Sequence, residues 1–460
     1  MAKAKELTVA KTKFGRARAS RFPAVFSVVC TLFIATLYLL NAFQWLDFRH
    51  SDILFRQRGM RPVDKHISLV AIDDDSIAAI GQYPWPRHVY KDLIEKLMKD
   101  GVKVVALDII FLNPSRPKED KALIDVTREF GPRIVHAVTV DPAVQNVYEF
   151  SYPFPALRKV VKSMGQVTMP IKDADGSIRT MPVFMGHSLA RYCWDWLTDK
   201  DAMPMLGVEA LAVFQGVDPK VYLKKPYLAG GLLLNLNFRG EKVKKVGTQV
   251  INGREEEVDV FEHGVPRISA ARVLKGDLSD KEKAILKGGL VFVGSTSLGA
   301  YDHNPSPFSP QDPSVLVHAT EADNLLRDRA LRMASPYVTV LLVPLLVGLA
   351  FWLGRLNPLT AGLAFAAALA ALLLGHYALF LNLYYIEFSA PLTAFVVTFF
   401  ALVIHKAVEE NRKAAEVRGM FGQYVAPEVV DILVKNPDKL SLGGEKRDMT
   451  MFFLDIAHFT

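Results

Sequence analysis

Acidic side chains follow two apolar runs near the start of the chain. Asp73, Asp74 and Asp75 come directly after the first run, and Asp108 lies at the end of the second. If both runs are strands of an α/β sheet, these carboxylates lie where such domains commonly bind ligands. A cluster of carboxylates could hold Ca²⁺ or a cationic ligand. The alternative is that Asp75 or Ser76 caps the following helix while the other carboxylates are solvated.

A second candidate is the motif Trp85-Pro86-Arg87, which comes shortly before an expected helix. It could form the aromatic wall of a ligand pocket to which Trp85 and Arg87 both belong. The alternative is an ordered turn that only leads into the helix. Both interpretations stay open at the level of sequence.

Residues 294–299 (GSTSLG) follow a later apolar run and could bind an anion through backbone N–H groups. They match neither G-x-x-x-x-G-K-[ST] nor G-x-S-x-G, so neither a P-loop nor a nucleophile elbow is predicted. The two cysteines, Cys30 and Cys193, lie in different segments, which excludes a disulfide scaffold. No Cys/His spacing typical of a metal site occurs. This part of the chain therefore indicates a binding domain for which no cofactor can be argued.

The elements that would position these residues alternate between short apolar runs and helical patterns. The expected strands are residues 67–72, 102–110, 133–140, 232–238 and 290–294, and the expected helices are 88–99 and 314–327. Alternation of apolar strands with helices is typical of an α/β domain whose largely parallel sheet is covered on both faces.

Apolar blocks near both ends of this domain predict four transmembrane helices. The expected spans are 22–46, 337–353, 359–381 and 385–405. Each is long enough to cross a hydrocarbon core of ~30 Å, and no charged residue lies between Arg332 and Arg355. The first block follows a basic leader but is too long for the apolar region of a cleaved signal peptide. The alternative for the last three blocks is a set of buried helices in a large soluble core.

The charge distribution predicts that both ends of the chain are cytoplasmic. Residues 1–21 hold seven basic residues and one acidic residue, which is nearly the whole net charge of +7. By the positive-inside rule this tail stays in the cytoplasm, and residues 47–335 are periplasmic or extracellular. Four spans return residues 406–444 to the cytoplasm as linker helices. We therefore expect a multi-pass protein of the cell's inner membrane, in contact with lipid, and no binding of nucleic acid.

Several short motifs occur in a fixed order within residues 47–335. They are VAIDDDS at 70–76, YPWPR at 83–87, VALDIIF at 105–111, DADGSIR at 173–179, and residues 290–302 and 318–326. This set resembles the CHASE type-two family of bacterial extracytoplasmic sensor domains. The resemblance implies a sensor that signals through three following helices to the cytoplasm, for a ligand or partner that the family leaves undefined. The candidate sensor-pocket residues are then Asp73, Asp74, Trp85, Arg87, Asp108 and Asp302.

Apolar or small residues continue beyond the last span at alternating spacings of four and three. They are Val403, Ala407, Ala414, Val417, Phe421 and Tyr424, and only Glu410 interrupts the row. This spacing suits a parallel coiled coil, and a single amphipathic helix is the alternative.

The end of the chain has a second set of motifs. FGQYVAP at 421–427, NP at 436–437 and LGGEKR at 442–447 precede an expected strand, 449–454, that runs into Asp455. Residues 445–460 resemble the start of a class III nucleotide cyclase domain, an α+β, ferredoxin-like fold of which only the first strand is present. The resemblance implies that the parent protein, a homodimer with shared active sites, converts ATP (or GTP) to a cyclic nucleotide and pyrophosphate.

In that family the Asp at this strand end coordinates two divalent cations. The match makes Asp455 and the Ile456 carbonyl metal contacts, and Phe459 and Thr460 part of the nucleotide-phosphate site. A carboxylate at a strand end is a rigid oxygen ligand for Mg²⁺ or Mn²⁺. Two such ions could activate the ribose 3′-hydroxyl and stabilise charge at the α-phosphate. His458 departs from the small residue that family members often carry.

The remaining catalytic groups of that family do not occur before Thr460, so we expect a fragment of a receptor cyclase. A non-catalytic membrane sensor or binding protein that truly ends near Thr460 is the alternative. A transporter is disfavoured, because no span carries Asp, Glu, Lys or Arg near its middle. His376 is the only candidate there.

Overall fold

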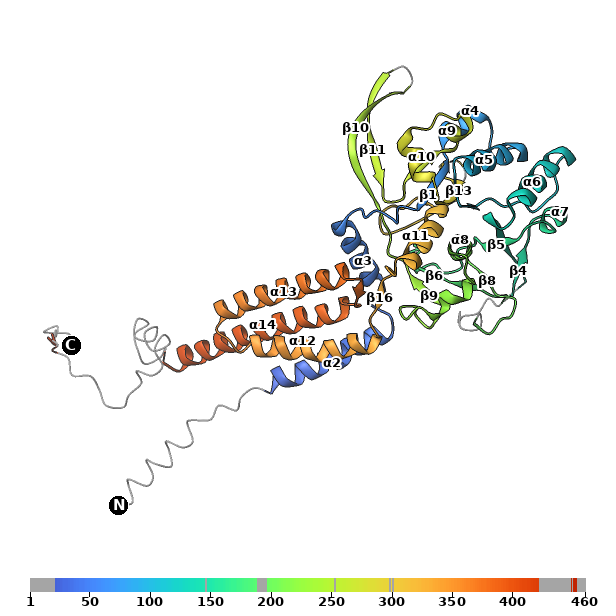
Figure 1. Cartoon of the computed structure of the whole chain (residues 1–460). Coiled ribbons are helices and arrows are strands. Elements are labelled where there is room, and N and C mark those ends of the chain that lie inside the picture. Colours follow the sequence, from blue (N-terminus) through green and yellow to red (C-terminus); the bar gives the residue numbers. More distant parts are fainter. Residues whose placement is uncertain are drawn as a thin grey trace. The chain divides into compact units, whose positions relative to one another are not determined.

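The computed structural model describes residues 21–144, 147–187, 197–251, 254–297, 299, 302–421, 448 and 450–452. The chain divides into two compact units, and Figure 1 labels many of their helices and strands. The α/β unit comprises Leu32–Leu345 and Ala366–Thr393. The helical unit comprises Met1–Thr31, Leu346–Phe365 and Ala394–Thr460.

The α/β unit is built on a seven-stranded sheet in the order β12-β1-β13-β2-β3-β4, with β5 also paired to β3. The strands are β1 (Ile67–Ile72), β2 (Val104–Leu107), β3 (Ile134–Val144), β4 (Val147–Ser151), β5 (Ser163–Gln166), β12 (Arg267–Ser269) and β13 (Leu290–Ser295). Every pair is parallel except β3 with β4. All residues of β1, β2 and β13 are buried, as expected for a parallel sheet covered on both faces.

Helices cover both faces of this sheet. They are α4 (Asp74–Ile80), α5 (Arg87–Lys99), α6 (Pro117–Phe130), α7 (Pro155–Arg158), α8 (Leu206–Gln215), α9 (Ala270–Lys275), α10 (Asp280–Leu286) and α11 (Ser314–Leu326). Val70 and Ile72 share a core with α5, α6 and α9, whereas Leu69 and Ala71 share a second core with α8 and α11. The alternation along β1 therefore sends successive side chains into different cores. The prediction of an α/β domain with a largely parallel sheet is confirmed.

Smaller elements complete this unit. They are α3 (Gln44–Arg58), β6 (Thr180–Pro182), β7 (Phe184–Met185), β8 (Met203–Pro204), β9 (Leu233–Asn235), β10 (Glu241–Ile251), β11 (Arg254–His263), β14 (His303–Asn304), β15 (Asp312–Pro313), and 3-10 turns at Gly131–Arg133 and Pro219–Lys224. Strands β10 and β11 form an antiparallel ribbon of their own.

Helix α11 carries several polar side chains that are fully buried. Asp323 accepts hydrogen bonds from the Arg239 guanidinium (Nε to Oδ2, 2.7 Å) and from the Asp64 backbone N–H (2.7 Å). Asn324 accepts a hydrogen bond from the Asn237 backbone N–H (2.7 Å). Buried polar groups of this kind stabilise a fold only when they are paired. These bonds tie the chain before β1 and the chain after β9 to one helix.

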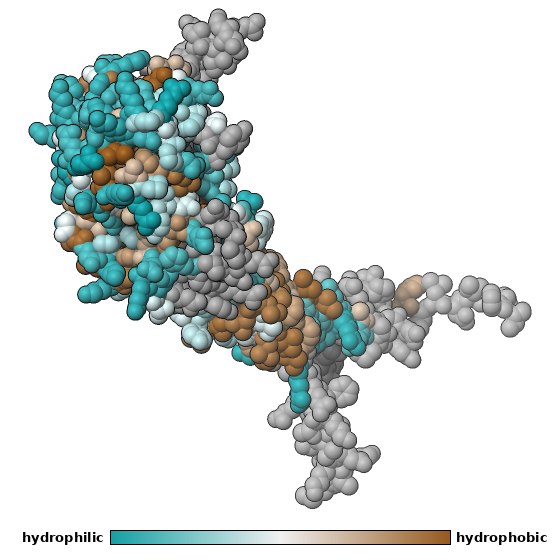
Figure 2. All heavy atoms as spheres, turned by 90° about the vertical axis from the view of Figure 1, so that its right-hand side faces the viewer, coloured by the Kyte–Doolittle hydropathy of each residue, from teal (hydrophilic) through white to brown (hydrophobic). Residues whose placement is uncertain are grey.

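Among the described residues, four helices are long and apolar enough to cross a membrane: α2 (Phe22–Leu39), α12 (Pro336–Leu353), α13 (Pro358–Leu381) and α14 (Ser389–Phe421). Figure 2 shows apolar residues, in brown, gathered over the helices, while polar residues, in teal, cover most of the visible α/β surface. Apolar side chains exposed on α2 include Leu32 and Phe33, each at least 60% exposed. Exposure on this scale fits a lipid environment better than water.

The segment between α13 and α14 is bonded to several neighbours inside the α/β unit. Strand β17 (Tyr384–Tyr385) pairs with β16 (Arg332–Met333), directly before α12. The Tyr385 hydroxyl donates to the backbone oxygen of Asp47 (2.8 Å), and the Ser389 N–H donates to the Asp47 carboxylate (3.0 Å). The Thr339 hydroxyl donates to the Glu387 carbonyl (3.0 Å). We call residues 384–389 the crossover segment.

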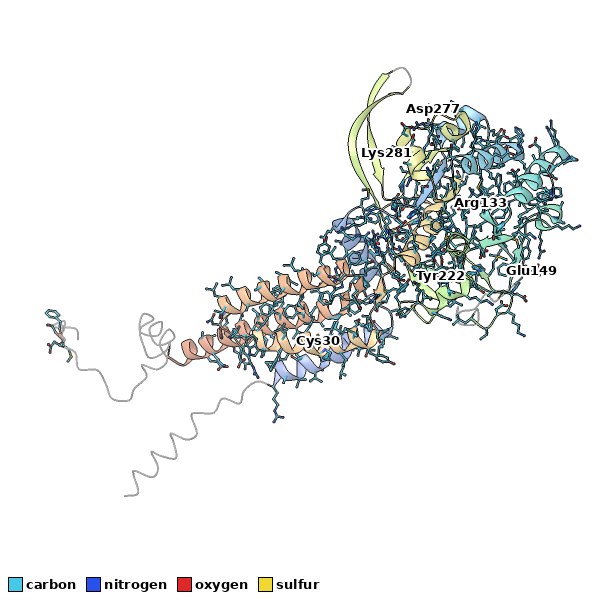
Figure 3. The ribbon with its side chains drawn as sticks, in the orientation of Figure 1. Cys30, Arg133, Glu149, Tyr222, Asp277 and Lys281 are labelled. Carbon is cyan, nitrogen blue, oxygen red and sulfur yellow. The ribbon has the colours of Figure 1, made fainter. Side chains whose placement is uncertain are left out.

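The helical unit brings together the other ends of these helices. The Lys406 ammonium donates to the Leu356 carbonyl (2.8 Å), and the ring of His405 lies 4.3 Å from that of Phe22. Cys30, labelled in Figure 3, is a buried free thiol that accepts a hydrogen bond from Thr398 (3.4 Å). The start of α2, the α12–α13 turn and the middle of α14 therefore contact one another.

Some expected boundaries differ from the structure. The expected span 22–46 contains a break: α2 ends at Leu39, Asn41 has a φ of 59°, and Trp45 belongs to α3. The expected span 385–405 begins at Ser389 instead, because Tyr384 and Tyr385 pair with β16. Strands β2 and β9 are shorter than the expected 102–110 and 232–238. After β2 the apolar residues continue as the wall of a pocket, which an apolar pattern does not distinguish from a strand.

Helices α8 and α11 pack closely at Gly207, and a substitution there can test this contact. A Cβ at this position would lie 2.6 Å from Glu321 Oε2 and would also overlap the His318 carbonyl oxygen. We expect Gly207→Ala to lower the free energy of unfolding by about 1–3 kcal/mol, the usual cost of overpacking.

Thermal unfolding of the purified full chain in a non-ionic detergent measures this change. Gly362→Ala is the matched control, because a Cβ at that helical glycine has open space. Equal melting temperatures for the two variants would show that α8 and α11 are not in such close contact.

Candidate functional site

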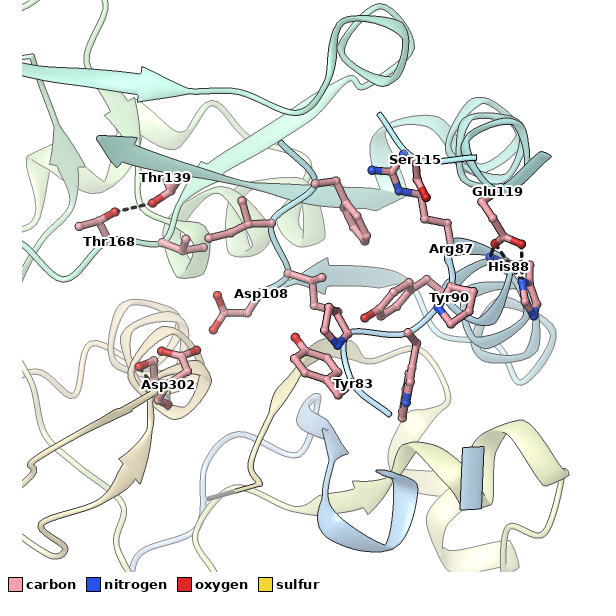
Figure 4. A pocket seen from close by; sticks show the side chains of 18 of the residues that line it. Tyr83, Arg87, His88, Tyr90, Asp108, Ser115, Glu119, Thr139, Thr168 and Asp302 are labelled. Atoms are coloured by element: carbon pink, nitrogen blue, oxygen red, sulfur yellow. Dashed lines mark hydrogen bonds and ion pairs between the residues drawn. The ribbon is translucent and has the colours of Figure 1, made fainter. Parts of the chain in front are cut away.

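A pocket of about 1000 Å³ opens at the carboxyl edge of the parallel sheet (Figure 4). The residues that follow β2 form its centre. The start of α5, the middle of β3, the residues after β5 and the segment before α11 form its walls. Its lining includes Tyr83, Trp85, Arg87, His88, Tyr90, Asp108, Phe111, Arg116, Glu119, Thr139, Thr168, Lys172, Asp302 and Ser314. The volume suits a small metabolite.

Asp108 is the first residue after β2, and its carboxylate points into the pocket (Figure 4). Its backbone N–H donates to the Val293 carbonyl (2.8 Å), which fixes its position at the sheet edge. The Oδ2 atom is buried and has no hydrogen-bond partner among the described residues. Burial raises the pKa of Asp108 well above its usual range, and the negative charge of Asp302 raises it further.

Asp302 is the second acid of this pocket, and it is exposed. The Ser314 N–H, at the start of α11, donates to the Asp302 carbonyl (3.1 Å) and holds this segment in place. Tyr83 lies on the same side, with its hydroxyl directed toward the two acids (Figure 4). Burial, then the charges of Asp108 and Asp302, raise the pKa of Tyr83 to about 12, so its hydroxyl remains a donor at neutral pH.

Aromatic rings form the inner wall. Trp85 is 4% exposed, and its indole N–H donates to the Gly81 carbonyl (3.0 Å), which fixes the plane of its ring. Its centroid lies 6.3 Å from that of Tyr83 and 6.0 Å from that of Tyr90. The Tyr90 centroid in turn lies 5.3 Å from that of Phe111. Trp85 is thus both part of the turn before α5 and part of a pocket wall.

The basic groups at the start of α5 are already paired. Arg87 donates to the Asp120 carboxylate and the Asn113 carbonyl, and its guanidinium carbon lies 4.3 Å from the centroid of the Phe154 ring. The His88 N–H donates to Glu119 (2.8 Å), and this hydrogen bond lowers the pKa of Glu119. Arg87 therefore supports one wall of the pocket through bonds within the protein.

Asp73 and Asp74 do not line the pocket. Asp73 is the N-cap of α4 and accepts a hydrogen bond from the Ser76 N–H (2.8 Å), a role that the sequence assigned to Asp75 or Ser76. Asp74 accepts a hydrogen bond from the Ser297 hydroxyl. Ser297 belongs to the expected anion-binding stretch, so this part of it faces a carboxylate. Trp85, Arg87, Asp108 and Asp302 are brought together, whereas Asp73 and Asp74 serve the local fold.

Thr139, Thr168 and Lys172 line the pocket but were not candidates from sequence. The hydroxyls of Thr139 and Thr168 lie 3.1 Å apart; Thr139 is within β3, just past its last pairing with β5, and Thr168 is two residues after β5. Thr139 lay inside the expected strand 133–140, and no strand was expected before Thr168, so the sequence offered little signal for this pair. Tyr83 could have been included among the candidates, because it is the first residue of the YPWPR motif.

The other expected sites have different outcomes. Asp455, Ile456, Phe459, Thr460 and His458 lie outside the described residues, as does Cys193. Residues 448 and 450–452, which border or overlap the expected strand, are not in a strand. His376 is buried, and its Nε2 lies 3.0 Å from the Ile386 carbonyl.

One further group of possible metal ligands, His187, Asp199 and Asp201, occurs in the described part of the chain. Asp199 already accepts hydrogen bonds from the backbone N–H groups of His187 (2.7 Å) and Asp201 (2.9 Å). These hydrogen bonds explain why the three side chains lie close together: Asp199 stabilises a local turn of the backbone.

The buried carboxyl of Asp108 leads to a prediction about pH. The pKa of Asp108 in the folded protein lies above its pKa in the unfolded chain. The contribution of this group to the free energy of unfolding is therefore complete at low pH, and it is lost as the pH rises through the pKa of the folded state. Asp108→Asn removes this pH-dependent loss of stability, because an amide does not ionise. We expect the variant to gain about 1–3 kcal/mol over wild type near neutral pH, because the amide cannot ionise and so avoids the free-energy cost of the raised carboxyl pKa.

Thermal unfolding between about pH 4 and pH 9 measures this difference. The charged or titratable groups that face Asp108, namely Asp302 and Tyr83, are unchanged in both proteins. Asp75→Asn, on an exposed position of α4, is the control. A difference between wild type and Asp108→Asn that does not grow with pH would contradict the burial of an ionisable Asp108.

Comparison with known proteins identifies the family. The CHASE2 domain matches residues 28–355, which contain the whole sheet, the pocket and the helices that flank them. No match was found among curated proteins or among solved structures. CHASE2 domains are extracytoplasmic sensors typical of receptor-type signalling proteins, and the apolar helices fit insertion into a membrane. Since the match covers more than half of the chain, this protein belongs to the CHASE2 family.

Proposed function

We propose that this chain is the sensor and membrane part of a receptor-type nucleotide cyclase of the bacterial inner membrane. Ligand binding in the extracytoplasmic pocket controls a cytoplasmic domain that converts ATP to cyclic AMP and pyrophosphate. The CHASE2 match supports the sensor. The motifs at 421–427, 436–437 and 442–447, together with Asp455, support the output domain.

The observation that carries this proposal is the continuity of α14. This single helix contains the last apolar stretch and extends through polar residues to Phe421, where the cyclase-like motifs begin. Its 33 residues span about 50 Å, more than the hydrocarbon core requires. A rigid rod of this length can transmit a rotation or a shift to a domain at its end.

The polar half of α14 is suited to pairing with a second copy. Pairs of opposite charge four residues apart stabilise it, with Lys413 3.0 Å from Glu409 and Arg412 3.2 Å from Glu416. Ala407, on the predicted seam, is exposed within one chain. A parallel homodimer would cover this seam and bring two output domains together, as shared active sites require.

Charges within the helical unit support cytoplasmic ends. Arg355 in the α12–α13 turn and Lys406 on α14 lie in one pocket with Pro23, the second residue of α2. Basic residues gather on the cytoplasmic side of membrane proteins, so this end of the helices is assigned there together with the basic tail. Residues 47–335 are then extracytoplasmic.

The output chemistry is assigned to Asp455, with the Ile456 carbonyl, as ligands of Mg²⁺ or Mn²⁺. Phe459 and Thr460 would contribute to the binding of nucleotide phosphates. These roles come from motif similarity alone, and GTP is the alternative substrate.

A direct test is to express the complete reading frame of the gene and to assay its protein with Mn²⁺ and ATP. We expect cyclic AMP, and loss of at least about 10²-fold in rate for Asp455→Asn, because the metal stabilises the charge that develops. Asp448→Asn serves as a nearby acidic control. A folded protein that forms no cyclic nucleotide, or a stop codon directly after Thr460, would favour a non-catalytic membrane sensor.

The helical relay gives a second test. One residue inserted between Ala407 and Ala414 rotates everything after it by ~100° and should change the basal cyclase rate several-fold. A seven-residue insertion at the same place restores the phase to within ~20° and should return the rate toward that of the parent protein. Equal rates for all three proteins would argue against a rigid relay through α14.

A further inference from the structure

We propose that the pocket in Figure 4 binds a small organic ammonium ion, whose charge lies between Asp108 and Asp302. This inference names the class of ligand that the sensor binds. It rests on the proposed function only in what binding would cause, namely a change in the cytoplasmic output. The binding itself depends on the geometry of the α/β unit alone.

The acidic side of the pocket brings two carboxyl groups together. Asp108 Oδ2 is buried in the wall without a hydrogen-bond partner in the described part of the chain. Asp302 lines the same pocket and repels the charged form of Asp108. A buried carboxylate without a partner is costly, and a cation between two carboxylates removes both the desolvation cost and the repulsion.

The basic lining residues do not supply that cation. Arg87 is bonded to Asp120 and to the Asn113 carbonyl, on the far side of the pocket from Asp302 (Figure 4). His88 is bonded to Glu119. Arg116 and Lys172 are exposed, where water screens their charges far more than it screens a buried carboxylate.

The remaining walls favour an organic cation. Tyr83, Trp85 and Tyr90 line the same pocket, and aromatic rings attract a desolvated cation. Phe111 and Phe154 already contact the Arg87 guanidinium in this way. The hydroxyls of Thr139 and Thr168 add acceptors for ammonium N–H groups.

A bare metal ion fits this pocket less well. Ca²⁺ prefers six to eight oxygen ligands. Among the described residues, no third carboxylate or histidine lies close enough to Asp108 and Asp302 to form a metal-binding group with them. The size of the pocket, about 1000 Å³, also exceeds what an ion needs.

Binding to the purified full chain in a non-ionic detergent, measured by calorimetry and by the shift in melting temperature, tests this inference. The probes are the chlorides of phenethylammonium, putrescine and tetramethylammonium. Phenethyl alcohol and hydrocinnamate are the neutral and anionic controls, and CaCl₂ is the metal control. We expect at least one ammonium probe to bind, and phenethylammonium to bind at least about tenfold more tightly than phenethyl alcohol.

Two variants locate the site. Asp302→Asn, at an exposed position, and Asp108→Asn should each weaken ammonium binding by about tenfold or more. Asp75→Asn removes one exposed carboxylate from the same unit, outside this pocket, and should leave the affinity within about twofold.

Three results would overturn the inference. They are no binding of any ammonium probe at about 10 mM, equal binding of the neutral control, or wild-type affinity in both Asp108→Asn and Asp302→Asn. Stabilisation by CaCl₂ without any effect of the ammonium probes would replace it with a metal site.

Failure of the proposed function gives a different pattern. Ammonium binding that depends on Asp108, in a complete protein whose cyclase rate does not respond, would leave the ligand class standing and remove the coupling. A cyclase rate that responds to some other ligand, with no ammonium binding, would remove only the ligand class.

Discussion

The parallel pairing of six strands is the constraint on which the rest of this structure depends. Because β12, β1, β13, β2, β3 and β5 run in one direction, the chain leaves all of them at the same edge of the sheet. Crossover helices must then cover both faces, which leaves that edge as the place where polar loops can meet. Asp108, Thr139 and Thr168 come together for this reason, although up to 60 residues separate them along the chain.

Helix α11 makes this arrangement rigid. Asp323 pairs with Arg239 inside the protein, and Ser314, at the other end of the helix, holds the Asp302 segment at the pocket. One helix thus connects the buried ion pair with the acidic side of the pocket. Asp108 Oδ2 is buried without a hydrogen-bond partner among the described residues, and it lies in the wall of the pocket, where a ligand can reach it.

Sequence reasoning predicted the parts of this structure that follow local patterns. The strand Ile67–Ile72 and the helix over 314–327 were predicted almost to the residue, because apolar continuity and helical spacing are local signals. The pocket was only partly predictable. Asp73 and Asp108 both follow strands and look alike in sequence, yet the Asp73 carboxylate turns back to cap α4 and the Asp108 carboxylate does not. That difference depends on local backbone direction, which residue types alone do not encode.

The crossover segment has a mechanical consequence. Its strand pairing with β16, its bonds to Asp47 and its bond to Thr339 join the start of α12, the end of α13 and the start of α14 to the chain that follows α2. No single helix can then slide like a piston while its neighbours stay fixed, unless these bonds break. A displacement of Arg332–Met333 would therefore be passed on as a concerted tilt of these helices, and tilt is the adjustment by which apolar helices respond to bilayer thickness.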